Sequence, residues 1–573
     1  MSASPTRARI IGTRHMAAAG HYLAAQAAFQ TLESGGNAVD AGVCGGIALG
    51  VLQSEYVGFG GVAPIMIRPA STGQVITISG LGTWPKAANL EIFHRDHGGL
   101  IPPGILRSLV PAAPDAWITA LERWGTMSFG DVASAAVRFA RDGFPMPVLT
   151  SRIITKAADN YRRWPANEEI YLPDGKPPQP GDIFVQSDLG KSIQYMIDQE
   201  AAAPGDRLAG LQAARDAFYR GDIAQTLVRH QVENGGWLSA EDLADFKVGI
   251  EAPISVRFRD FEVYTCGPWC QGPLLAQTLR LLDGVDLESM GHNEPAYIHT
   301  IVEALKLAYA DREQYVGDPR FVDVPIAGML ADKYIDERRR LIDPNAAAPG
   351  MPEPGRPEGA AWTRAITPEP TGPADELSQI DTSYISVIDS EGSVFSATPS
   401  DGSAAGPIVP GLGFLPSGRG TQSRTDPAHP AVLAPGKRPR LTPNPAIAIR
   451  DGHWIMPFGS PGNDVQPQAM TQVLLNIFSF GMTPQDAVEQ PRFASFSYPR
   501  SSNPNPYSPG LMNLEGRFPE ETATKLRALG HDVALWPDWD PAAGAVCAIF
   551  YDQKAGTMEG GSDPRRPTAV AGW

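Results

Sequence analysis

The sequence predicts an α+β protein, because apolar residues with helical spacing and short β-branched runs both occur along one long chain. The chain has 573 residues, so it forms either two domains or one large layered domain with insertions. Hydrophobic residues make up 43% of it, enough for a sizeable core, which excludes a disordered or collagen-like chain. Its 59 glycines and 54 prolines imply many turns and long loops, which argues against a helical bundle.

Helices are expected where good helix formers or apolar residues recur with the helical period. The first expected helix, 16–34, is rich in alanine, and Gly35-Gly36 ends it. The clearest amphipathic pattern lies in 294–316, where the apolar residues fall on one face. In chain order, helices are expected at 16–34, 39–53, 111–142 and 294–316, and strand-like runs occur at 63–67 and 74–78.

A long segment without apolar periodicity separates this part of the chain from the next strands. Residues 343–376 are dominated by proline, glycine, alanine and glutamate, so the segment is expected to be mobile. It ends just before Thr382 and has two interpretations. It is either an ordinary linker or an autoproteolytic junction whose cut frees Thr382 as a new N-terminus. The pattern alone favours the linker, because linkers are common and self-cleaving junctions are rare.

Two short runs after this segment, 382–388 and 393–398, predict a β-hairpin. With the turn centred on the middle of the loop, Thr382 faces the residue between Thr398 and Ser400. One hairpin would then gather hydroxyl groups around Thr382. A shift of the register by one residue would change which hydroxyl is nearest.

Charge and motif content exclude several classes of function. The chain has 63 acidic and 47 basic residues, a net charge of −16, so binding to nucleic acid or to anionic membranes is not expected. A P-loop, an HExxH motif, a GxSxG motif and a GxGxxG motif after a strand are all absent from the sequence. Four cysteines are too few for a disulfide scaffold, and Cys266 and Cys270 alone are a weak zinc signal. No continuous apolar signal or membrane span is found, so a cytoplasmic location is expected.

Six sequence stretches follow one another in order along nearly the whole chain. They are LAAQAAFQTLESGGNAVDAGVCGGIALGVLQSEYVGFGGV, GGWLSAEDLADF, VEALKLAYADREQYVGDP, DTSYISVIDSEGSVFSAT, GSPGND and GGSDPRRPTAVAGW. With these stretches the chain resembles the γ-glutamyltransferase family of N-terminal-nucleophile hydrolases over about residues 14–573. Each stretch alone would be weak, but six in the right order are strong support for the fold and the maturation chemistry.

The resemblance implies a four-layer αββα sandwich that is made as one precursor and cut before a threonine. The cut would fall between Asp381 and Thr382. It would give a large subunit, 1–381, and a small subunit, 382–573, intertwined as a heterodimer that is free to assemble further. Residues 343–380 would be the mobile linker that precedes the cleavage site.

The resemblance assigns the catalytic roles to Thr382, Ser400 and a loop at 459–463. A threonine hydroxyl needs an adjacent base, and the α-amino group freed by the cut, with a pKa of ~7.7–8.0, would supply it. Ser400 stands where the family has a threonine that holds the nucleophile, although the residue alone is equally consistent with a turn serine. Gly462 and Asn463 stand where the family has two glycines that hold the oxyanion through backbone N–H groups. A simple Gly/Pro turn is the alternative for this loop.

The positions that hold a γ-glutamyl group in the family carry different residues here. Leu81 replaces an arginine that holds the α-carboxylate, and residues 416–422 contain no acid for the α-ammonium group. An unsatisfied zwitterion in an apolar site is costly, so glutathione is not the expected substrate. Arg419 is a candidate anchor for an anionic acyl group, and a surface-loop arginine is the alternative. The residues assigned to substrate binding are Leu81, Trp84, Arg419, Thr442 and Ser460.

The sequence therefore predicts an autoprocessed threonine amidohydrolase that cleaves an amide through a Thr382 acyl-enzyme. Its acyl group would be non-glutamyl, as in the cephalosporin acylase and oxamate amidohydrolase branches of the family. A true γ-glutamyltransferase or glutathione hydrolase is the alternative within the class, and an uncleaved, inactive binding protein is the alternative of another class. No metal or organic cofactor is implied. The expected partners are a small-molecule amide and the chain's own cleaved subunit, with no nucleic acid and no membrane.

Overall fold

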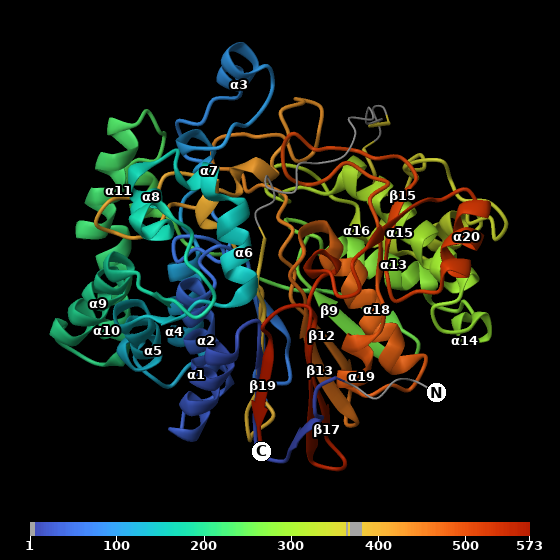
Figure 1. Cartoon of the computed structure of the whole chain (residues 1–573), viewed down its shortest axis with the longest axis horizontal. Coiled ribbons are helices and arrows are strands. Elements are labelled where there is room, and N and C mark those ends of the chain that lie inside the picture. Colours follow the sequence, from blue (N-terminus) through green and yellow to red (C-terminus); the bar gives the residue numbers. More distant parts are fainter. Residues whose placement is uncertain (1–5, 362–364, 367–380) are drawn as a thin grey trace.

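The computed structural model describes residues 6–361, 365–366 and 381–573, and two seven-stranded antiparallel sheets form its centre (Figure 1). In spatial order, sheet A consists of β1 Ile10–Gly12, β18 Thr557–Ser562, β17 Cys547–Asp552, β13 Trp454–Gly459, β12 Ala446–Arg450, β9 Phe261–Thr265 and β8 Ile254–Phe258. Sheet B consists of β19 Ala569–Gly572, β2 Met16–Ala19, β10 Ile385–Ile388, β11 Val394–Ala397, β3 Ile65–Arg68, β4 Ile76–Ile78 and β7 Ile250–Glu251. The mixed helix-and-strand class expected from the sequence is confirmed.

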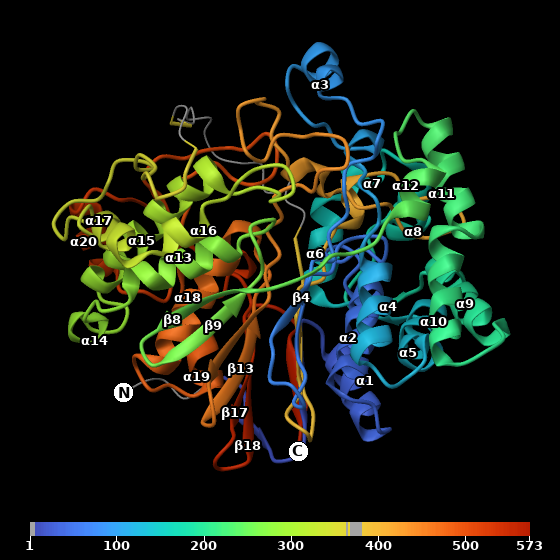
Figure 2. The same ribbon diagram turned by 180° about the vertical axis from the view of Figure 1, so that it is seen from behind.

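Helices flank this pair of sheets on both sides (Figures 1 and 2). The helices on the sheet B side are α1 Tyr22–Glu33, α2 Ala38–Leu52, α4 Ala113–Trp124, α5 Phe129–Asp142, α9 Ser187–Ala202, α10 Arg207–Tyr219 and α11 Asp222–Glu233. Those on the sheet A side are α13 Gly272–Leu282, α14 Leu287–Met290, α15 Pro295–Tyr315, α16 Ile326–Leu330, α17 Asp332–Arg339, α18 Gln466–Phe478, α19 Pro484–Glu489 and α20 Glu520–Ala528. Shorter helices are α3 Leu90–His97, α6 Val148–Lys156, α7 Ala158–Tyr161, α8 Pro165–Tyr171 and α12 Ala240–Asp245. A small sheet joins β14 Phe493–Ser495, β15 Leu511–Glu515 and β16 Asp532–Trp536, and β5 Phe144–Pro145 pairs with β6 Ile183–Phe184.

Strand β10 is buried on both faces because each sheet packs against helices and against the other sheet. Its alternating side chains divide between two apolar clusters. Ile385 and Val387 pack in the cluster with α1 and α2, whereas Tyr384 and Ile388 pack in the cluster that also contains Ile447 of sheet A. A third cluster joins sheet A to α13, α15 and α18.

Both sheets contain strands from before and after residue 381. In sheet B, β10 lies between β2 and β11, and β11 pairs in turn with β3. In sheet A, β12 pairs with β9 and β18 pairs with β1. A cut before Thr382 would therefore leave two fragments that share both sheets.

The expected element boundaries are confirmed for α2 and α15, and three other expectations are wrong. Residues 16–19 are not helical but form β2, an inner strand of sheet B, because pairing with β10 and β19 outweighs the helix propensity of alanine. The expected helix 111–142 is two helices, α4 and α5, with a break at Gly125. Helix α15 is buried on nearly all sides rather than on one face.

The predicted hairpin is confirmed, but its register differs by one residue from the expected one. Ile385 pairs with Ala397, so Thr382 faces Ser400 directly and forms an isolated bridge with it. The turn is longer on one side because the Asp389 N–H bonds to the Ser393 carbonyl and Gly392 is left-handed, with a φ of 82°. A glycine at the end of a three-residue loop permits this geometry.

Part of the expected linker lies against the rest of the protein. Residues 343–361 contain no helix or strand. Hydrogen bonds hold them at Ala347 N to Leu529 O (2.7 Å) and at Gly355 N to Asp311 Oδ1 (2.8 Å). The remainder of the predicted linker up to residue 380, apart from 365 and 366, lies outside the described residues. Within the described part of the chain, no helix is both long and apolar enough to cross a membrane.

Candidate active site

Thr382 is fixed at the start of β10 by the hairpin. Its side chain and that of Ser400 are buried, and their hydroxyl oxygens lie 2.8 Å apart. The Gln466 side chain, at the first turn of α18, donates a hydrogen bond to Thr382 Oγ1 at 3.2 Å. The Ser383 N–H bonds to the Pro399 carbonyl, which continues the strand pairing around the threonine. The Thr382 hydroxyl is therefore held in one orientation by two side chains.

The peptide carbonyl just before Thr382 accepts two side-chain hydrogen bonds. Ser400 Oγ donates to the Asp381 carbonyl oxygen at 2.6 Å, and Arg419 Nη2 donates to the same oxygen at 2.8 Å. A cation and a hydroxyl at a carbonyl oxygen stabilise the negative charge that develops when a nucleophile attacks the carbonyl carbon. The arrangement is suited to cutting the Asp381–Thr382 bond.

Arg419 is fully buried in a short 3₁₀ turn, residues 419–422, so the alternative of a surface-loop arginine is wrong. Its guanidinium also contacts Ser400 Oγ, and Thr442 Oγ1 lies 3.5 Å from Nη1. Burial lowers the pKa of Arg419 to about 10, and the nearby carboxylates of Asp401 and Asp381 oppose that shift. Arg419 therefore stays protonated at neutral pH.

The loop at 459–463 reaches the same peptide from the other side. Gly462 has a φ of 117°, and its N–H donates to Asp381 Oδ1 at 2.9 Å. Asn463 is also left-handed, with a φ of 51°, a conformation that asparagine tolerates better than most residues. Asparagine in place of the family's second glycine thus keeps a backbone shape that glycine would favour.

The other residues assigned to substrate binding lie at different distances from Thr382. Thr442 Oγ1 accepts a hydrogen bond from Gln422 and lies beside Arg419. Trp84 is buried behind the 419–422 turn, where it donates to Ser423 Oγ at 2.8 Å. Leu81 is buried in the cluster between the sheets, and Ser460 bonds to the loop backbone at Pro461 and Ala545. The structure thus gathers Thr382, Ser400, Arg419, Thr442 and Gly462, whereas Leu81, Trp84 and Ser460 form no hydrogen bond with Thr382 or Ser400 in the part of the chain that the structure describes.

Several residues of this site were missed at the sequence level. Arg566 pairs with Asp381, Gln466 bonds to Thr382, and Asp401 accepts a hydrogen bond from Ser417 Oγ, two residues before Arg419. Arg566 belongs to the C-terminal stretch GGSDPRR, which carried the resemblance but no assigned role. Contacts between residues this far apart in sequence leave no local pattern. The stretch GGSDPRR was therefore the one feature of the sequence that could have pointed to Arg566.

A cavity of about 360 Å³ adjoins the site. It is lined by Glu55, Arg107 and Gly402 among others, and Gly402 directly follows Asp401. Asp401 accepts hydrogen bonds from Ser417 Oγ and from the Gly418 N–H, at the start of the turn that carries Arg419. Asp401 therefore links Gly402 at the cavity wall to the turn that carries Arg419.

Removal of the Ser400 hydroxyl should slow both maturation and turnover. Ser400→Ala deletes one hydrogen bond to the scissile carbonyl and one to the nucleophile, so a loss of ~10–100-fold in each rate is expected. The measurements are the rate at which two fragments appear on a denaturing gel and the kcat of the matured enzyme. Ser400→Thr, which restores the family's residue, should be tolerated. Normal rates in both steps for Ser400→Ala would exclude this role and point to Thr398.

Glu55 predicts a pH-dependent contribution to stability. Burial raises the pKa of Glu55 from its ordinary 4.5 to about 7, although Thr150 donates to it. Between these pH values the folded carboxyl keeps a proton that the unfolded chain releases, so stability falls as the pH rises. Glu55→Gln removes the titrating group, so the variant avoids this loss of about 3 kcal/mol in the free energy of unfolding. The Tm of the variant relative to wild type should therefore be higher at pH 8 than at pH 5.

Calorimetric Tm values at the two pH values test this expectation. The exposed residue Glu520, at the start of α20, provides the matched control Glu520→Gln, which should not change its relative Tm between pH 5 and pH 8. A Glu55→Gln difference that is the same at both pH values would contradict the expected titration of Glu55.

One group among the described residues has the composition of a metal site. His299, Glu303 and His531 bring their ligand atoms within 4.8 Å of one another. However, Glu303 Oε1 is bonded to the Lys306 ammonium at 2.7 Å, and the two imidazoles bond to each other at 2.9 Å. The ammonium group would repel a cation, so these contacts are explained by a buried hydrogen-bond network.

The two central sheets with helices on both sides, and the site at the start of β10 where Ser400 and Arg419 bind the Asp381 carbonyl beside the Thr382 hydroxyl, define the class of protein. The profile of the family described as Gamma-glutamyltranspeptidase matches residues 24–573, and the chain belongs to that family. It is 31% identical to the Acylase ACY 1 proenzyme of Pseudomonas sp. (strain SE83), over 98% of this chain and 94% of that protein. It is 30% identical to the Glutathione hydrolase-like YwrD proenzyme of Bacillus subtilis (strain 168), over 98% and 99%.

Solved structures agree with this assignment. The cephalosporin acylase of Bacillus halodurans matches with a TM-score of 0.85 and 26% identity, over 100% of this chain and 98% of that one. Relatives matched over nearly the full length include other glutathione hydrolases and an oxamate amidohydrolase. Because these relatives are named hydrolases and acylases, the chain is an enzyme of this family.

Proposed function

We propose that the chain is a threonine amidohydrolase that cuts its own Asp381–Thr382 bond and then hydrolyses an amide with a non-glutamyl acyl group. The observation that carries this proposal is that Ser400 and Arg419 both donate to the Asp381 carbonyl while Ser400 also bonds to the Thr382 hydroxyl. A segment that only links two parts of a chain does not need a buried arginine and a buried serine that both donate hydrogen bonds to one backbone carbonyl oxygen. The proenzyme names of the relatives support synthesis as a precursor.

Maturation proceeds in two balanced steps. Thr382 Oγ attacks the Asp381 carbonyl carbon, the peptide C–N bond breaks, and the proton lost by the Thr382 hydroxyl passes to the threonine nitrogen, which becomes a free amine. This leaves Asp381 as an ester on Thr382 Oγ, which water then hydrolyses to a carboxylate and a free hydroxyl. Ser400 and Arg419 stabilise the oxyanion of the first step.

Turnover repeats the same chemistry on a substrate. The freed α-amino group accepts the proton of Thr382 Oγ, the oxygen attacks the substrate carbonyl, and the amine product leaves with that proton. Water hydrolyses the resulting acyl ester. The cut also removes Asp381 from Gly462, so its N–H becomes available as an oxyanion donor.

The pocket chemistry supports an acyl group without an α-ammonium. Leu81, at the position of the family's carboxylate-binding arginine, is a buried apolar residue. Asp401 is an acid beside the site, but Ser417 Oγ and the Gly418 N–H already bind its carboxylate. The Arg419 guanidinium also lies near this carboxylate and favours its charged form. A γ-glutamyl substrate would leave its ammonium group unpaired.

A panel of anilides tests the substrate class. The matured enzyme is assayed with γ-glutamyl, glutaryl, succinyl, oxalyl and butyryl p-nitroanilides. Since two or three charged hydrogen bonds are missing, the γ-glutamyl compound should have a kcat/KM ~10²-fold below the best acyl compound. A highest kcat/KM for the γ-glutamyl compound would instead support a γ-glutamyl hydrolase or transferase.

The proposal includes the four-layer αββα architecture of N-terminal-nucleophile hydrolases. Three buried clusters support it: one between the sheets, one between sheet B and α1 and α2, and one between sheet A and α13, α15 and α18. Because the strands of both proposed subunits interleave, the cut fragments would remain associated without any covalent link.

A further inference from the structure

Arg566 is a buried arginine that loses its carboxylate partner if the proposed cut occurs. In the uncut chain its Nη2 atom lies 2.5 Å from Asp381 Oδ2. We propose that in the cut enzyme Arg566 binds a carboxylate carried by the substrate's acyl group, which is a short dicarboxylic group such as succinyl. This inference rests on the proposed function, because it requires the bond before Thr382 to be cut.

Among the described residues, Asp381 is the carboxylate that pairs directly with Arg566, and Asp563 acts on it only at longer range. Only 4% of its side chain is exposed, and its Nε and Nη1 atoms are buried with no hydrogen-bond partner among the described residues. Its Nη2 also donates to the Pro541 carbonyl at 2.9 Å, and the guanidinium lies 4.7 Å from the centre of the Tyr56 ring. A buried guanidinium left without an anion is costly, so departure of Asp381 leaves a site that favours a new carboxylate.

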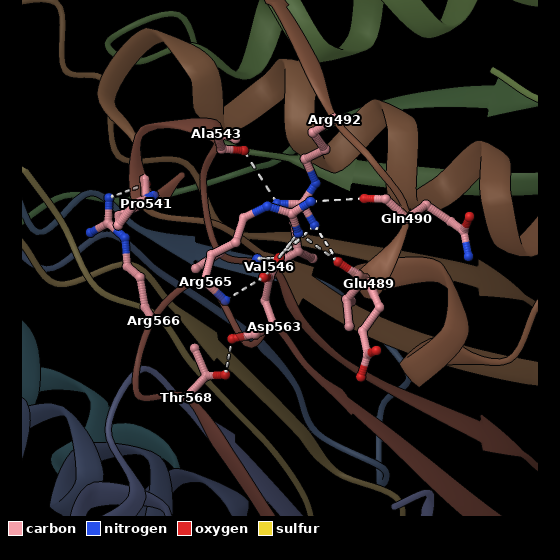
Figure 3. Close-up of polar contacts among 12 residues, drawn as sticks. Glu489, Gln490, Arg492, Pro541, Ala543, Val546, Asp563, Arg565, Arg566 and Thr568 are labelled. Carbon is pink, nitrogen blue, oxygen red and sulfur yellow. Dashed lines mark hydrogen bonds and ion pairs between the residues drawn. The ribbon is translucent and has the colours of Figure 1, made fainter. Parts of the chain in front are cut away.

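The adjacent arginine has the opposite character. Arg565 forms a bidentate pair with Glu515, at 2.6 Å for both contacts, and it also bonds to Asp563. Figure 3 shows Arg565 inside the cluster with Arg492 and Asp563, whereas Arg566 turns away from that cluster toward Pro541. Arg565 therefore stabilises the C-terminal fold, and Arg566 is directed to the scissile residue.

The chemistry of maturation indicates the length of the acyl group. During the cut, Asp381 becomes an acyl ester on Thr382 Oγ, the same bond that a substrate forms later. The Asp381 carboxyl carbon is separated from its carbonyl carbon by two carbons, which is the spacing of a succinyl group. A succinyl ester on Thr382 can therefore reach Arg566 as Asp381 does.

The two arginines then have separate tasks. Arg419 donates to the carbonyl oxygen at the reacting end, and Arg566 pairs with the carboxylate at the far end. Neither position requires an α-ammonium group on the acyl chain. These two roles agree with the absence from residues 416–422 of an acid that could pair with an α-ammonium group.

Binding of the free acids tests the inference without depending on turnover. Isothermal titration calorimetry compares succinate with butyrate, which has the same number of carbons but one carboxylate. The matured wild-type enzyme should bind succinate at least tenfold more tightly than butyrate. Uncut Thr382→Ala protein, in which Asp381 still occupies Arg566, should show no such preference. The matured Arg566→Gln variant should lose the preference, and the exposed Arg9→Gln control should keep it.

The outcomes distinguish a failure of the role of Arg566 from a failure of the proposed function. Equal binding of succinate and butyrate by the cut wild-type enzyme would overturn the role of Arg566 and leave the proposed function intact. The same preference in uncut Thr382→Ala protein would also overturn it, because the binding site would then lie elsewhere. If the Arg566→Gln variant is not cut, the inference is still tested by comparing the preference for succinate over butyrate in cut wild type and in uncut Thr382→Ala protein. A wild-type chain that stays uncut would overturn the proposed function and this inference together, and a denaturing gel distinguishes that case.

Discussion

Thr382→Ala should leave one uncut chain with no measurable amidase activity. In the proposed mechanism the same hydroxyl attacks the Asp381 carbonyl during maturation and the substrate carbonyl during turnover, so its loss should abolish both steps. Removing a nucleophile of this kind lowers the rate by at least ~10³-fold. The measurements are intact mass of the purified variant and hydrolysis of the acyl anilide that wild type cleaves best.

Thr382→Ser is the matched control for this variant. It keeps a hydroxyl at the same position, so it should still be cut and should retain part of the activity. Efficient cleavage of the alanine variant, or a small fragment that does not begin with Thr-Ser-Tyr-Ile, would contradict the role of Thr382.

Arg419→Ala should slow maturation by ~10²–10³-fold, the usual cost of removing one donor from an oxyanion site. Arg419 Nη2 lies 2.8 Å from the Asp381 carbonyl oxygen, so the variant loses the cation at the reacting bond. The measurement is the rate at which the two fragments appear after cell-free synthesis. Arg419→Lys should recover part of the rate, because it keeps a charge but loses the planar geometry.

A second variant separates this effect from a failure to fold. Arg419→Ala leaves Asp401 buried beside a missing positive charge, which threatens stability. The double variant Arg419→Ala/Asp401→Asn removes both charges and should recover Tm without recovering the maturation rate. Cutting of the double variant at the wild-type rate would show that Arg419 serves only to balance Asp401.

The hairpin pattern predicted that Thr382 and Ser400 lie close together, and the structure confirms this proximity. Local pairing brings Thr382 close to Ser400, and the six family stretches identified the same two residues. The exact register was missed because Gly392 adopts a left-handed conformation and lengthens the turn. Residues 16–19 were misassigned because their alanines favour a helix in isolation, while β10 and β19 determine their actual conformation.

The part of the site that depends on distant segments was not predictable. Arg566 meets Asp381 only because β18 and β19 bring the C-terminal stretch between the two sheets. Arg419 was considered as an anchor for substrate, but its contact with the scissile carbonyl requires the 3₁₀ turn to fold beneath Ser400. These contacts join residues far apart in sequence, and no local periodicity encodes them.

Intact mass of the purified wild-type protein under denaturing conditions tests the central claim most directly. The account predicts two fragments, residues 1–381 and residues 382–573, the second beginning Thr-Ser-Tyr-Ile. It also predicts a transient acyl adduct on the smaller fragment when a slow acyl substrate is added before quenching. A single full-length mass that persists on incubation, with no adduct, would contradict it and indicate an inactive, uncleaved member of the family.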